Sequence, residues 1–135
     1  MSGVVSPPAP PVRREQPGAK VRVVPLLAAI KDAKDFLNAG QYLHLTDIVK
    51  RLADWENREE ISDLRVEPIQ GMRELKEKGG ILGRINVRVY FAYLKQRREV
   101  VVLGAFKKEC EGQTPGYVLL RVRNRLRIYL EELAD

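Results

Sequence analysis

The chain has 135 residues, of which 44% are hydrophobic and 31% are charged, and this length and composition are typical of a single folded domain. No run approaches the ~18 uninterrupted apolar residues of a membrane-spanning helix, so we expect no contact with a membrane. The chain has a single cysteine, Cys110, so it cannot form an intrachain disulfide. It has a single histidine, His44, and these two residues are too few for a Cys/His metal site. We therefore predict no metal and no other cofactor.

The net charge of +6 is unevenly distributed along the chain. Residues 1–70 contain ten of the 24 basic and ten of the 18 acidic side chains, so the whole surplus lies in residues 71–135. Between Arg84 and Arg127, eleven basic residues stand against three acidic ones. Such a concentration attracts RNA and other polyanions through counterion release, and it attracts acidic protein partners as well.

The first 18 residues differ in composition from the rest of the chain. Five of the eight prolines lie in the first seventeen residues, a pattern typical of an extended, solvated segment. We predict a disordered Pro-rich tail over residues 1–18 and a folded domain over residues 19–135. This amino terminus has no apolar segment of signal-peptide length, so we expect a cytoplasmic protein.

Two amphipathic helices are predicted after a short β-branched strand at residues 21–24. The first helix has Pro25 in its first turn and ends at Asn38 and Gly40. The second begins with Thr46 as its N-cap and carries an apolar stripe as far as Trp55. So short a connection predicts that the two helices pack as a hairpin.

From Met72 onward the apolar period changes to two, which indicates strands. We predict three antiparallel strands, the second with Arg88 and Tyr90 on the face opposite its apolar side chains, and the third central because it is apolar on both faces. Thr114 and Pro115 then start a final helix. The fold class is thus α+β, with an N-terminal helical hairpin packed on a small antiparallel β-meander and a C-terminal helix.

This order and several local motifs resemble the RelE/ParE toxin superfamily, most closely its HigB-like, phage-associated branch. The corresponding segments are MRELK (72–76), GGILGR (79–84), VRVYFAYL (87–94), VVVLGAF (100–106) and KKECEGQTP (107–115). The KK…TP segment directly after a strand that ends in Phe is the most specific of them. Two departures are Lys76, where the family has an arginine, and Gly104-Ala105, where HigB-like members often carry a histidine.

The resemblance implies a type II toxin that is held inactive by a cognate antitoxin protein and that cleaves mRNA on the ribosome. That reaction, attack of a 2′-hydroxyl on the adjacent phosphate, needs charge stabilisation and proton transfer but no metal. The candidate catalytic residues are Arg88, Lys107, Arg84 and Lys108. The candidate RNA-binding residues are Lys76, Tyr90 as a stacking platform, Arg121 and Arg125.

Three alternatives remain open at this point. A ParE-like member would inhibit DNA gyrase by surface contacts, and a non-catalytic RNA-binding module could keep the same fold. The basic residues of the strands could also form a solvated sheet edge that deters aggregation. The arginines of the last helix could likewise form a solvated surface of that helix.

Overall fold

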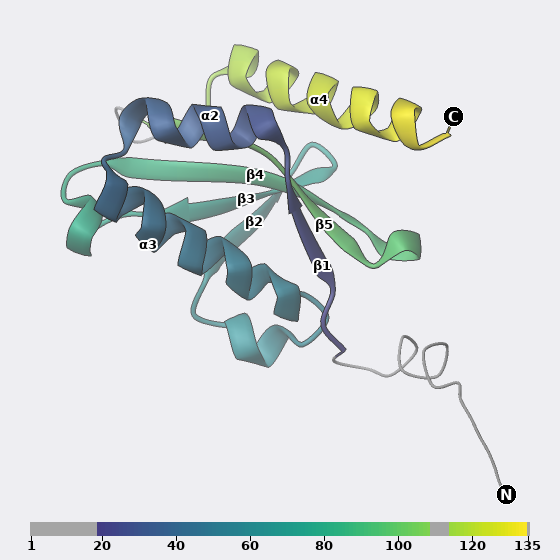
Figure 1. Ribbon diagram of the computed structural model, residues 1–135, viewed down its shortest axis with the longest axis horizontal. Helices are drawn as coiled ribbons and strands as arrows, with labels where there is room; N and C mark the ends of the chain where they lie inside the picture. The colour runs from purple at the N-terminus through teal and green to yellow at the C-terminus, as the bar shows by residue number, and fades with distance from the viewer. Residues whose placement is uncertain (1–18, 109–113, 135) are drawn as a thin grey trace, which may run out of the picture.

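The computed structural model describes residues 19–108 and 114–134 (Figure 1). The predicted tail, residues 1–18, lies outside the described residues. The helices and strands are β1 (Arg22–Pro25), α2 (Leu27–Phe36), α3 (Ala39–Lys50), β2 (Arg65–Ile69), β3 (Met72–Glu77), β4 (Asn86–Leu94), β5 (Glu99–Lys108) and α4 (Gly116–Ala134).

The strands form one five-stranded sheet in the order β1-β5-β4-β3-β2. The predicted antiparallel meander is confirmed as β3, β4 and β5, and β5 is a buried interior strand between β1 and β4, as its apolar pattern indicates. The sequence did not predict β2, which pairs antiparallel with β3, nor that β1 runs parallel to β5. The β2–β3 turn consists of Gln70 (φ 48°) and Gly71 (φ 81°), the left-handed pair that a two-residue hairpin favours.

The boundary between the two N-terminal helices differs from the prediction. Asn38 begins the second helix instead of ending the first, because its side chain accepts a hydrogen bond from the Gln41 backbone amide at 2.8 Å. The Gln41 side chain accepts one in return from the Asn38 amide at 3.0 Å, which completes a capping box. Thr46 is therefore inside α3, where its hydroxyl donates to the Tyr42 carbonyl.

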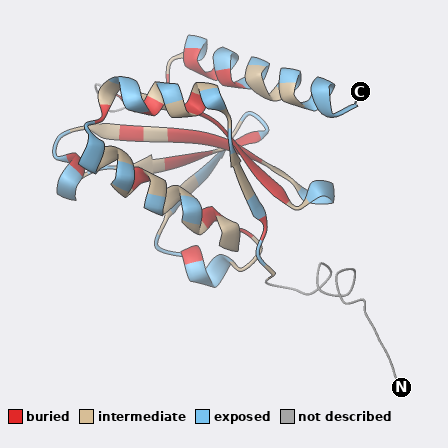
Figure 2. Ribbon diagram, viewed as in Figure 1, coloured by how far each residue is buried: buried red, intermediate tan, exposed pale blue. Residues whose placement is uncertain are grey.

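Helices cover both faces of the sheet (Figures 1 and 2). The face under α2 and α3 holds the larger core cluster, in which Trp55 packs edge-on against Phe91 with ring centroids 5.3 Å apart. Trp55 is 3% exposed, which confirms its predicted place in the core. The opposite face holds a second cluster, in which Val118, Leu119 and Val122 attach α4 to the sheet. The molecule is thus a three-layer arrangement with helices on each side.

A polar cluster fixes α4 against α2 and β5. The Arg125 guanidinium donates to the Asp32 carboxylate at 2.6 Å and to the Leu103 carbonyl at 2.9 Å. Asp32 also accepts from the Ala105 amide at 3.1 Å. Gly104 lies within this cluster, where a Cβ atom would come 2.8 Å from Arg125 Nη1. The glycine is required here because the two helices approach the strand closely.

Candidate nucleic-acid interface

Three basic residues lie side by side on the face of the sheet that α4 partly covers. Lys76 of β3 is paired with Arg65 of β2 on one side and with Arg88 of β4 on the other. Residues directly opposite each other on neighbouring strands project from the same face. Arg65, Lys76 and Arg88 therefore form a line of cations across three strands, here called the basic row.

A cavity of about 290 Å³ adjoins the basic row at the start of α4. Lys76 and Arg88 line it together with two carboxylates, Glu67 and Glu74, and with Thr114, which precedes α4. The 19-residue α4 begins at Gly116, so the partial positive charge of its N-terminal end lies on this side of the cavity. The cations and the helix end attract anions to this cavity, which already contains the carboxylates of Glu67 and Glu74.

Glu67 bonds to the basic row at the sheet edge. Its Oε1 atom lies 2.9 Å from Lys76 Nζ, and the glutamate is 58% exposed whereas the lysine is 19% exposed. The hydrogen bond from Lys76 lowers the pKa of Glu67 below its ordinary value, and the positive charges of Lys76, Arg65 and Arg88 add to this effect. The ion partner of Lys76 is thus Glu67 of β2, a strand that the sequence did not predict.

Glu74 takes part in a buried network instead. Its Oε2 atom accepts hydrogen bonds from the Tyr90 hydroxyl at 2.9 Å and from the Thr114 hydroxyl at 2.7 Å. Arg88 Nε lies 4.0 Å from the same oxygen. Burial raises the pKa of Tyr90 above its ordinary value, and the negative charge of Glu74 raises it further, so the phenol stays protonated and donates. The network joins β3, β4 and the residue before α4.

This burial contradicts the predicted role of Tyr90. Its side chain is 0% exposed, so no face of the ring is open for a base to stack on it. Alternation placed Tyr90 correctly on the Arg88 face, but no local pattern indicates that Glu74 and Thr114 contact its hydroxyl.

The four candidate catalytic residues do not come together. Lys107 is paired with Val87, whose side chain packs in the core under α2 and α3, so Lys107 projects from the face opposite Arg88. Lys108 is on the Arg88 face but is 5% exposed. Arg84 lies in an exposed turn before β4 instead of on the strand. Only Arg88 of these four lines the cavity.

The predicted RNA-binding arginines of the last helix also separate. Arg125 is 19% exposed and is engaged by Asp32 and by the Leu103 carbonyl, so its guanidinium serves to attach α4. Arg121 is exposed on α4. Of the predicted site residues, Lys76 and Arg88 belong to the basic row. Arg65 and Glu67, which lie beside them, were not predicted from the sequence. The alternating segment Arg65–Ile69 was the signal that could have revealed them.

No group of three His, Cys, Asp or Glu side chains that could hold a metal ion occurs within residues 19–108 and 114–134. Over the same described part of the chain, every helix is too short or too polar to cross a membrane.

Comparisons with known proteins give structural matches only. No family model matches the chain, and no curated protein matches it. A double arginine-to-alanine mutant of the Escherichia coli toxin RelE in the free state matches with a TM-score of 0.53 and 12% identity, over 78% of this chain and 97% of that one. This protein has the RelE fold. The RelBE2 toxin–antitoxin complex of Mycobacterium tuberculosis matches with a TM-score of 0.46 and 12% identity, over 66% of this chain and 99% of that one.

The RelE likeness confirms the predicted α+β architecture, with the helical pair, the sheet and the C-terminal helix in the expected order. At 12% identity it shows the fold alone.

Proposed function

We propose that this protein is a toxin of a toxin–antitoxin system that binds mRNA on the ribosome and cleaves it. The observation that carries the proposal is the basic row beside the cavity at the start of α4, on a fold shared with a RelE toxin. A cognate antitoxin is the expected protein partner. Membership of the HigB-like branch is part of this proposal and rests on the KK…TP segment at residues 107–115.

In this proposal the basic row holds the RNA backbone. Arg65 binds one phosphate at the exposed edge, while Arg88 stabilises the negative charge that builds on the phosphate under attack. Lys76 is held by Glu67 in the absence of RNA. A phosphate that approaches Lys76 replaces the Glu67 carboxylate, because both are anions that bind the same ammonium group.

Glu67 is then the candidate proton acceptor. No histidine lines the cavity, and Glu74 is engaged by Tyr90 and Thr114. Glu67 is the exposed carboxylate of the cavity, and its lowered pKa keeps it ionised at neutral pH. Once Lys76 has moved to the phosphate, Glu67 can accept the proton of the attacking 2′-hydroxyl. As the 2′-oxygen bonds to phosphorus, the bond from phosphorus to the 5′-oxygen breaks, and this leaving oxygen takes a proton from the Lys76 ammonium group.

One observation favours a second candidate, a non-catalytic RNA-binding module. Two of the three cations of the basic row already have carboxylate neighbours, Lys76 with Glu67 and Arg88 with Glu74. Such pairs reduce the local positive charge and leave RNA binding possible without strong stabilisation of a transition state.

The test is to induce the protein in bacteria and to map the 5′ ends of cellular mRNA. The proposal predicts new 5′ ends within translated regions, and their loss in Arg88→Gln. Lys31→Gln, an exposed change on α2 with the same loss of one positive charge, is the matched control and should cleave normally. RNA binding without new 5′ ends would favour the module. Growth arrest with altered DNA supercoiling and intact mRNA would favour the gyrase alternative.

A further inference from the structure

Helix α4 carries more exposed large apolar side chains than any other element among the described residues. Eight large apolar side chains are exposed in residues 19–108 and 114–134, and five of these eight are on α4. They are Tyr117, Leu120, Ile128, Leu130 and Leu133. Val118, Leu119 and Val122 attach the first half of α4 to the sheet. Leu130 and Leu133 continue this side of the helix at i+4 and i+7 from Leu126, but they are exposed. Exposed apolar side chains that continue a packing face are a candidate interaction site.

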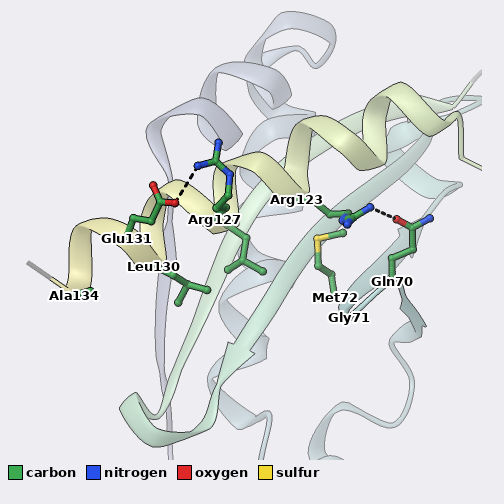
Figure 3. Close-up of a pocket in the computed structure, with 9 residues that line it drawn as sticks. Gln70, Gly71, Met72, Arg123, Arg127, Leu130, Glu131 and Ala134 are labelled. Carbon is green, nitrogen blue, oxygen red and sulfur yellow. Dashed lines mark hydrogen bonds and ion pairs between the residues drawn. The ribbon is translucent and has the colours of Figure 1, made fainter.

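Part of this surface borders a groove between α4 and the β2–β3 turn (Figure 3). The groove has a volume of about 500 Å³, and we call it the α4 groove. Leu126, Leu130 and Ala134 form its wall on the helix, and Met72 lies on the side of the turn. Leu130 is 42% exposed and Met72 is 2% exposed, so the groove has an apolar floor and an open apolar wall.

The rim of the α4 groove is positively charged. Arg123 Nη1 lies 3.3 Å from the neutral Gln70 side chain, and Arg127 Nη1 lies 3.0 Å from Glu131. The helix as a whole has four arginines and two glutamates. An occupant of the groove therefore meets aliphatic side chains at the centre and surplus positive charge at the edge.

We propose that the α4 groove binds an acidic amphipathic segment of a protein partner. The segment places an aliphatic side chain between Met72 and Leu130 and its carboxylates beside Arg123 and Arg127. Helix-in-groove and extended-segment complexes use such apolar anchors, and complementary charge around them selects the partner. The site is separate from the cavity of the basic row, and it requires no RNA cleavage. Only the identification of this partner as the antitoxin rests on the proposed function.

Other occupants fit the groove less well. RNA offers no aliphatic group for a floor made by Met72. A second copy of the chain brings the same surplus of arginines on α4. The chain's own residues 1–18 contain two arginines and one glutamate and so lack the acidic character. A lipid surface suits a helix whose apolar face is open to it, whereas Glu131 lines this groove.

The test uses synthetic peptides of about 18 residues with leucines at i, i+3, i+4 and i+7 spacing. One peptide carries glutamates beside the leucines, a second carries lysines there, and a third has the glutamates but serines in place of the leucines. Calorimetric titration of the full chain should show binding of the first peptide, and binding at least about tenfold weaker for the other two.

Variants then locate the binding. Leu130→Asp and Arg123→Glu should each weaken binding of the acidic peptide about tenfold. The matched controls, Leu43→Asp on α3 and Lys31→Glu on α2, should bind as the wild type does, because both positions are exposed helix positions outside the groove.

Each of several outcomes would overturn the proposal. In the peptide titration, these are equal binding of the lysine peptide and an unchanged affinity in Leu130→Asp. In sedimentation, it is a wild-type dimer that Leu130→Asp dissociates, because a second copy would then occupy the groove. With phosphatidylglycerol vesicles, it is preferential binding that Leu130→Asp abolishes. Peptide binding by a protein that yields no new mRNA 5′ ends would refute the proposed function and leave this inference intact.

Discussion

The two faces of the sheet use the same strands for different purposes. Leu75, Val87, Val89 and Phe91 face α2 and α3 and are each no more than 1% exposed. The residues that alternate with these along the strands face the α4 side, and they include Glu74, Lys76 and Arg88. The first face supplies the larger share of the apolar burial, while the second combines a smaller apolar cluster with charges that apolar packing does not require. The comparison predicts that mutations on the two faces separate stability from RNA binding.

The largest expected effect on stability is on the face of the sheet under α2 and α3. Phe91→Ala removes a ring that is 0% exposed and that contacts Trp55 edge-on. It should lower the free energy of unfolding by about 3–5 kcal/mol, measured by urea denaturation. Leu43→Ala, at a side chain that is 63% exposed, is the control and should change it by less than about 0.5 kcal/mol. Similar values for the two variants would contradict the assigned core.

A smaller loss of stability is expected where α4 meets the sheet. Gly104→Ala places a Cβ atom 2.8 Å from both Arg125 Nη1 and Val122 Cγ1. The resulting displacement of α4 should lower the free energy of unfolding by about 1–3 kcal/mol. Gly116→Ala is the control, because its added Cβ would meet nothing within 4 Å beyond its chain neighbours and its own helix backbone. An unchanged melting temperature in Gly104→Ala would mean that α4 does not approach β5 this closely.

Tyr90→Phe tests whether this tyrosine is structural. The change removes the hydroxyl that donates to Glu74 and should cost about 1 kcal/mol of stability. Because the folded pKa of Tyr90 is raised above its ordinary value of 10.0, the stability that the hydroxyl contributes is complete below pH 10. The difference in melting temperature from the wild type should therefore shrink as the pH rises above 10. RNA affinity should stay unchanged, and a large loss of affinity would show that the hydroxyl itself takes part in RNA binding.

Much of the sheet could be predicted because alternation is a local property. The period of two in residues 87–94 fixed which side chains share a face, and that assignment was right for Arg88 and Tyr90. The same alternation places Lys107 opposite Arg88, but the KK…TP segment is predicted to follow the strand, whereas β5 continues to Lys108. For that reason the structure separates Lys107 from Arg88, which the sequence analysis groups in one site.

The rest of the site depends on contacts between distant parts of the chain. Residues 65–69 contain Pro68, which discourages a strand assignment, yet Pro68 is tolerated because β2 is an edge strand. Without β2, neither Arg65 nor Glu67 could be placed beside Lys76. The hydrogen bond from Arg125 to Asp32 joins residues that are 93 positions apart. The apolar periodicity of a segment does not predict such a distant pair.

The smallest expected effect sharpens the account of the basic row. Glu67→Gln removes the carboxylate that holds Lys76, so RNA affinity should rise by about two- to fivefold. If Glu67 is also the proton acceptor, the same variant should cleave more slowly. Since the folded pKa of Glu67 is lowered, its ion pair stabilises the fold at neutral pH, and this contribution is lost as the pH falls below 4.5 toward that pKa. Equal affinity and equal cleavage in wild type and variant would remove Glu67 from the mechanism.

The most direct test of the basic row is the salt dependence of RNA affinity. If Arg65 contacts a phosphate, Arg65→Glu should weaken binding of single-stranded RNA and reduce the slope of log affinity against log salt by about 1. Lys31→Glu, with the same charge change on the α2 side, should leave the slope unaltered. Equal slopes and affinities for the wild type and Arg65→Glu would contradict the claim that RNA binds along Arg65, Lys76 and Arg88.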